Sequence, residues 1–231
     1  MSKEVYMACC KNVKELKSKR KMIVKLFNEA LRRNSKQDIE LLTPIYALFY
    51  SAYAEVSFQK LINTPNGFEQ SVIEEIDKQR NLEEKWSKCV EIAISNIGNS
   101  NKGEIANKKK SLKNILNEYI IHPSRIRNKI AHGQWMECLN NDCSKVNVDV
   151  TYEISSLDFV KLDRLFTIYE DFQQCIEDLI KSPKTHYRDF YLIICKIEEY
   201  IVQTKDWSVE TKREQLIKSN KYKNYCRRGI S

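Results

Sequence analysis

The feature that most constrains the fold is helical spacing of apolar residues over long segments that contain no glycine or proline. In residues 3–33 the apolar side chains recur at helical intervals, and lysines and arginines cover the other face. The whole chain of 231 residues has only five glycines and four prolines, so few positions break a helix. The sequence therefore predicts an all-α fold, a helical bundle.

The same pattern extends along most of the chain. Further helices are predicted at residues 38–62, 68–97, from about 108 to 121, from Ser155 or Ser156 to about 181, and at 186–204. The segment 38–62 is the most apolar, so we expect it at the centre of the core. We predict one domain over residues 1–231, with a core at about 38–181. The helix 3–33 precedes this core, and a helical extension at 186–220 follows it.

One region departs from the helical pattern. Residues 134–139 and 145–154 show alternation and β-forming residues, including Val146, Val148, Val150 and Tyr152. The segment Asn140-Asn141-Asp142 between them is typical of a turn. The sequence therefore predicts a small β-hairpin insertion, or an extended excursion, directly after Gly133.

The stretch before this region is Arg125-Ile126-Arg127-Asn128-Lys129-Ile130-Ala131-His132-Gly133-Gln134-Trp135. Pro123 and Ser124 indicate a helix start, and Gly133 indicates its end. Asn128 and His132 are four residues apart and share a face. Arg127 lies about 140° around the helix from His132. The two converge on one ligand only if His132 lies in a frayed last turn, which Gly133 allows.

These residue types suit cleavage of RNA without a metal. An imidazole titrates near pH 6.5 and can take a proton from a ribose 2′-hydroxyl. An arginine stabilises the charge that develops on phosphorus, and an asparagine can donate to the same phosphate. A second copy of the chain would supply the proton for the leaving oxygen. The alternative is a structural histidine whose cation the helix dipole favours.

The segment Arg127-Asn128-x-x-x-His132, with Ala131 before the histidine and Gly133-Gln134-Trp135 after it, resembles the motif of HEPN (higher eukaryotes and prokaryotes nucleotide-binding) domains. The resemblance covers residues of about 40–180 and implies a HEPN-like helical bundle. Active members are metal-independent endoribonucleases of toxin, abortive-infection and antiviral defence systems. They are homodimers with a composite active site. Carried over, Arg127 and His132 are catalytic and Asn128 supports them.

Glu55 is the only charged residue between Pro44 and Phe58. A carboxylate in such an apolar segment needs a partner or water, because burying an unpaired charge is costly. Arg127 is the candidate partner, and the resemblance implies the same pairing, which gives Glu55 a supporting role. The alternative places Glu55 at a helix edge in water.

The net charge of +8 fits a polyanionic partner such as RNA, although it can also serve solubility alone. We expect Arg125, Lys129, Lys109 and Lys113 to contact an RNA backbone; a solvated lysine cluster is the alternative for the last two. His122 is a candidate second proton carrier, but an exposed histidine at a hinge is the simpler interpretation. The basic, tyrosine-containing C-terminal segment either binds single-stranded nucleic acid or is a frayed tail.

Eight cysteines without a CxxC pair indicate reduced thiols and a cytoplasmic protein. Cys138 and Cys143 are too loosely spaced to favour a metal site. We expect no metal and no cofactor. We also expect no signal peptide, because the N-terminus has no apolar core of that kind, and no membrane span, because the longest apolar run, 44–58, is too short.

Three functional hypotheses follow. The first is an endoribonuclease with RNA and an antitoxin or defence protein as partners. The second is a non-catalytic HEPN-like module that binds RNA, a nucleotide or a protein. The third is a helical interaction protein without a role in nucleic-acid binding.

Overall fold

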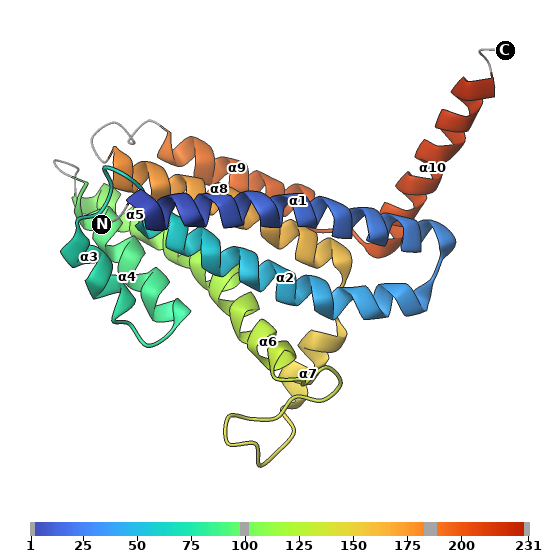
Figure 1. Cartoon of the computed structure of the whole chain (residues 1–231), viewed down its shortest axis with the longest axis horizontal. Helices are drawn as coiled ribbons and strands as arrows, with labels where there is room; N and C mark the ends of the chain where they lie inside the picture. The colour runs from blue at the N-terminus through green and yellow to red at the C-terminus, as the bar shows by residue number, and fades with distance from the viewer. Residues whose placement is uncertain (1–2, 98–101, 183–188, 229–231) are drawn as a thin grey trace.

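The structure, a computed structural model, describes residues 3–97, 102–182 and 189–228, with side chains placed up to residue 219. It is built of helices, and the described residues contain no strand, so the predicted all-α fold is confirmed. Four helices run side by side along the long axis of the molecule (Figure 1): α1 (Lys3–Arg33), α2 (Lys36–Ile62), α8 (Phe159–Lys181) and α9 (Phe190–Gln203). No helix in the described ranges is long and apolar enough to cross a membrane.

A tight turn reverses the chain between α1 and α2. Asn34 adopts the left-handed conformation with φ 54°, and the Ser35 hydroxyl accepts a hydrogen bond from the amide of Asp38. This Ser35 cap satisfies one of the free N–H groups at the start of α2. As expected, α2 is central: its aromatic side chains pack between those of α1 and α8. The ring centroid of Tyr46 on α2, for example, lies 5.6 Å from that of Phe27 on α1 and 5.1 Å from that of Phe166 on α8.

A polar cluster ties the same three helices together. Arg20 of α1 donates to the carboxylate of Asp163 on α8 at 2.7 Å and to the hydroxyl of Tyr46 on α2 at 3.2 Å. Its guanidinium also lies 4.2 Å from the ring centroid of Phe166. Because each polar group has a partner, the cluster can lie inside the bundle and fix the relative positions of the helices.

The predicted helix at 68–97 is wrong in one respect: it is two helices, α3 (Gln70–Asp77) and α4 (Leu82–Ser95). The side chain of Asn81 accepts a hydrogen bond from the amide of Glu84 at 2.9 Å, so it begins a new helix in place of continuing the old one. Asp158, not Ser155 or Ser156, caps α8.

The predicted helix start at Pro123 and Ser124 is right in position, because a helix begins at His122 with Pro123 in its first turn, but Ser124 does not cap it and no break precedes it. The chain runs without interruption from α5 (Lys102–Leu116) through a π-helical turn, η1 (Asn117–Ile121), into α6 (His122–Ala131). The amide of His122 bonds to the carbonyl of Asn117, five residues back. Pro123 has no amide hydrogen and would crowd the preceding turn of an α-helix. The widened turn relieves this crowding, so the helix continues.

The predicted β-hairpin after Gly133 is not formed. Leu139 and Val146 make one isolated antiparallel bridge, but the second arm is a helix, α7 (Val148–Ser155). The side chain of Asn147 accepts from the amide of Val150 at 3.1 Å and caps this helix. The cap and the packing of Ile154 against the core override the β-propensity of the valines.

The bundle ends in α10 (Val209–Arg228), which projects away from its neighbours in Figure 1. Near its start, Arg213 donates to the carbonyl of Leu31 at the end of α1. The predicted extension at 186–220 therefore consists of α9 and α10, and its expected start at 186 lies outside the described residues. The side chains of the basic, tyrosine-containing tail from residue 220 onward lie outside them as well.

Candidate functional site

The motif helix α6 ends as expected. Gly133 has φ 78°, a conformation that glycine adopts without a Cβ penalty. Its amide bonds to the carbonyl of Ile130, and the amide of Gln134 bonds to that of Lys129, which is the Schellman arrangement. The indole N–H of Trp135 also donates to the carbonyl of Ile130. His132 therefore lies just beyond the last helical turn, with an exposed side chain.

His132 and Asn128 line one polar groove with a volume of about 840 Å³. One wall is α6, which also contributes Arg125, Lys129 and His122; the other wall is the loop after Gly133 together with α7. In Figure 1 these elements form the lower end of the molecule. The loop is held against α6 because Lys129 donates to the carbonyl of Leu139 at 2.6 Å.

Arg127 lies elsewhere. Its Nη1 donates to Oε1 of Glu55 on α2 at 2.7 Å, and Nη2 lies 3.4 Å from the hydroxyl oxygen of Ser124. The Arg127 side chain is only 13 % exposed, whereas that of Glu55 is 55 % exposed. The expected ion pair between Arg127 and Glu55 is therefore confirmed. It ties the motif helix to the central helix of the bundle.

Arg127 and His132 do not converge within one chain. Arg127 lines a cavity between α2, α6 and α8, whereas His132 lines the polar groove on another side of α6. Five residues of helix turn the chain by about 140° beyond a full turn. The backbone leaves the helical conformation only at His132 itself, so the imidazole does not turn back toward the guanidinium of Arg127.

The four basic residues expected to contact RNA fall into two groups. Arg125 and Lys129 line the groove, although Arg125 is engaged by both carboxylate oxygens of Glu83 at 2.7 and 2.8 Å. Lys109 and Lys113 lie on α5 beside a separate pocket of about 190 Å³. That placement separates these two lysines from His132.

His122 has more neighbours than the sequence suggested. It is exposed, as expected for a histidine at a hinge, but its Nε2 lies 3.4 Å from Oε1 of Glu153 on α7, and it lines the groove of His132. The two histidines are ten positions apart, which corresponds to about 15 Å of helix, so one chain does not place both on one phosphate. Glu153 lay in a segment predicted as a strand, which hid this pairing.

Within the described ranges, no group of three or more histidine, cysteine, aspartate or glutamate side chains could hold a metal ion. Comparison of the chain with protein-family models, with curated proteins and with solved structures finds no match. The resemblance of the Arg127–His132 segment to the HEPN motif therefore stays a prediction.

Proposed function

We propose that the protein is a HEPN-type, metal-independent endoribonuclease that binds RNA in the polar groove. The observation that carries the proposal is the exposed imidazole of His132 at the end of α6, with Asn128 one turn away in the same groove. Lys129 adds a positive charge to its wall, which also holds Arg125, whose charge is paired with Glu83. An exposed proton carrier beside phosphate-binding side chains is what the reaction requires.

In the proposed reaction, His132 takes the proton from a ribose 2′-hydroxyl, and the resulting oxygen attacks the adjacent phosphorus. Asn128 donates a hydrogen bond to a phosphate oxygen. The products are a 2′,3′-cyclic phosphate and a 5′-hydroxyl, whose proton comes from His132 of a second copy. The HEPN resemblance assigns to Arg127, steadied by Glu55, the stabilisation of charge on the phosphate. This role requires the homodimer to turn the guanidinium toward the phosphate, because within one chain Arg127 lies outside the groove. The HEPN resemblance favours a toxin or antiviral defence role in the cytoplasm, with an antitoxin or defence protein as a further partner.

The test is cleavage of total RNA and tRNA in EDTA by the wild-type protein, His132→Ala and His122→Ala, with analysis of the RNA ends. We expect His132→Ala to lose at least about 100-fold in rate, because it removes the general base. His122→Ala should retain most of the activity. Cleavage that needs a divalent metal, or products with 5′-phosphates, would contradict the proposal.

A second candidate is a non-catalytic RNA-binding module. The position of Arg127 favours it, because within one chain this residue pairs with Glu55 and lies outside the groove. In that case the full-length protein binds RNA with an affinity that falls steeply with salt, and neither wild-type protein nor His132→Ala cleaves it.

A further inference from the structure

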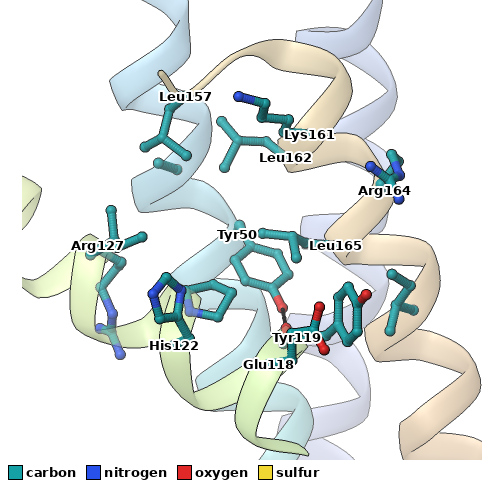
Figure 2. Close-up of a pocket in the computed structure, with 14 residues that line it drawn as sticks. Tyr50, Glu118, Tyr119, His122, Arg127, Leu157, Lys161, Leu162, Arg164 and Leu165 are labelled. Atoms are coloured by element: carbon teal, nitrogen blue, oxygen red, sulfur yellow. Dashed lines mark hydrogen bonds between the residues drawn. The ribbon is translucent and has the colours of Figure 1, made fainter. Parts of the chain in front are cut away.

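A second cavity lies behind the motif helix. It has a volume of about 340 Å³, opens to solvent and is bounded by α2, η1, α6 and α8 (Figure 2). Most of its lining is aliphatic or aromatic, with Tyr50, Ile126, Leu157, Leu162, Leu165 and Ile168 as its main side chains. Small-molecule sites in proteins are typically concave, mostly apolar and about 300–1,000 Å³ in volume. The cavity is therefore large enough for a small organic ligand.

The tyrosine hydroxyl in this lining already has a partner. Tyr50 donates to the backbone carbonyl of Tyr119 at 3.4 Å, as Figure 2 shows. Burial raises the pKa of Tyr50, so the phenol stays neutral. This part of the lining suits an apolar group, because it presents no charge and its buried polar atom is satisfied.

The charged groups stand around the apolar lining (Figure 2). Lys161 and Arg164 lie three residues apart on α8 and so on neighbouring positions of one face. Arg164 is held in place by bonds from Nε to the hydroxyl of Thr204 at 2.8 Å and from Nη2 to the carbonyl of Ile201 at 3.4 Å. Both acceptors are neutral, and among the described residues no carboxylate lies within ion-pair distance of Arg164.

The lining also holds a third cation and one carboxylate. Arg127 also lines the cavity and is paired with Glu55 outside it. Among the described lining residues, Glu118 is the one carboxylate. It stands beside Tyr119, whose pKa is raised to about 12 by burial and by Glu118, while the charge of Arg164 opposes the rise. Lys161 donates to the carbonyl of Ser156 at 2.5 Å and lies 3.9 Å from Oδ2 of Asp158. Arg164 is therefore the lining cation that has no carboxylate at ion-pair distance among the described residues, and its charge favours an anionic group at the edge of the cavity.

The π-helical turn η1 supplies Glu118 and Tyr119 to the same wall. Turns of this kind occur frequently at functional sites. In an α-helix the carbonyl of Tyr119 would accept from the amide four residues on, but Pro123 has no amide hydrogen, and the Tyr50 hydroxyl donates to this carbonyl. The cavity therefore depends on a local feature of the chain and not only on the spacing of three helices.

We propose that this cavity binds a small amphipathic acid, with its apolar body against Tyr50, Leu162 and Leu165 and its anionic head on Lys161 and Arg164. A medium-chain carboxylic acid has this chemistry. The proposal does not depend on the ribonuclease function, because it concerns the other side of α6. Ile126 and Arg127 nevertheless line the cavity, so a bound ligand contacts the motif helix directly.

The test is calorimetric titration of the full-length protein with octanoate and with 1-octanol, which has the same body without the charge. We expect octanoate to bind at least about tenfold more tightly, equivalent to about 1.4 kcal/mol, because it gains charge-assisted hydrogen bonds. Leu165→Trp should fill the cavity and abolish binding of both compounds. Absence of octanoate binding, or equal affinity for the two compounds, would overturn the proposal.

Charge variants keep the test decisive if Leu165→Trp fails to fold. Lys161 is exposed, so Lys161→Gln should fold and lose most of the preference for octanoate while binding octanol as before. Arg164→Gln should lose it as well. Lys110→Gln, an exposed lysine of α5 that does not line the cavity, is the matched control and should leave both affinities unchanged. An unchanged preference in both cavity variants would refute the assigned head-group site.

Discussion

At the scale of single residues, the ion pair between Arg127 and Glu55 gives the sharpest stability prediction. The guanidinium is 13 % exposed, so removing Glu55 leaves a largely buried charge without its carboxylate. We expect a double-mutant cycle of Arg127→Ala and Glu55→Ala, measured by urea denaturation, to give a coupling energy of about 1 kcal/mol.

A neighbouring pair provides the control for this cycle. Arg125 and Glu83 have the same chemistry, with a 2.7 Å contact, but their side chains are 66 % and 40 % exposed. Solvent screens such a pair, so the cycle of Arg125→Ala and Glu83→Ala should give a weaker coupling. Equal coupling in both cycles would mean that burial of Arg127 contributes nothing.

At the scale of an element, α7 depends on its cap. The helix has eight residues and is rich in β-formers, so its intrinsic stability is low. Asn147→Ala removes the bond to the amide of Val150 and should cost about 1 kcal/mol. We expect hydrogen exchange of the amides at 150–155 to become roughly fivefold faster, with little change in α8.

Two substitutions separate the cap from other effects at that site. Asn147→Asp keeps an acceptor at the same position, and aspartate caps helices as well as asparagine does, so exchange should stay near the wild-type rate. Asn141→Ala changes a similar side chain in the preceding loop without touching the cap. If Asn147→Ala leaves the exchange rates unaltered, packing alone maintains α7.

At the scale of the whole molecule, a buried carboxylate links the ends of two long helices. Glu177 of α8 accepts from Lys60 of α2 at 3.4 Å and from Lys181 of its own helix. Burial alone would raise the pKa of Glu177, but the Lys181 hydrogen bond and the Lys60 charge outweigh it and lower the pKa. A lowered folded-state pKa adds stability above the ordinary value of 4.5, and this stability is lost as the pH falls further.

The corresponding measurement is thermal unfolding of wild type and Glu177→Gln between pH 7 and pH 3. At pH 7 the variant should be less stable by about 2 kcal/mol, because it loses charge-assisted hydrogen bonds. The difference in stability should narrow below pH 4.5, because there the unfolded wild-type chain takes up a proton at Glu177 more readily than the folded protein does. Glu214→Gln, from an exposed pair with Lys218 on α10, should follow the wild-type curve. A difference in stability between wild type and Glu177→Gln that stays the same from pH 7 to pH 3 would exclude titration of Glu177 as its cause.

Local signals in the sequence were sufficient for the helical architecture. Helical spacing predicted the long helices, Gly133 predicted the end of the motif helix, and the isolation of Glu55 in an apolar segment predicted its pairing with Arg127. The first two depend on interactions within a few residues. Glu55 itself is 55 % exposed, as the alternative of a helix edge in water expected, so its pairing compensates the burial of Arg127 and not of the carboxylate. Such features are visible before the chain is folded.

Only the tertiary structure decided what surrounds those features. The segment 148–155 has β-forming residues, yet a cap and its contact with the core make it a helix. Lys109 and Lys113 lie away from the groove, and His122 meets Glu153. Helix packing angles and loop paths determine these outcomes. They arise from contacts between residues far apart in sequence, and periodicity along one helix contains no record of such contacts.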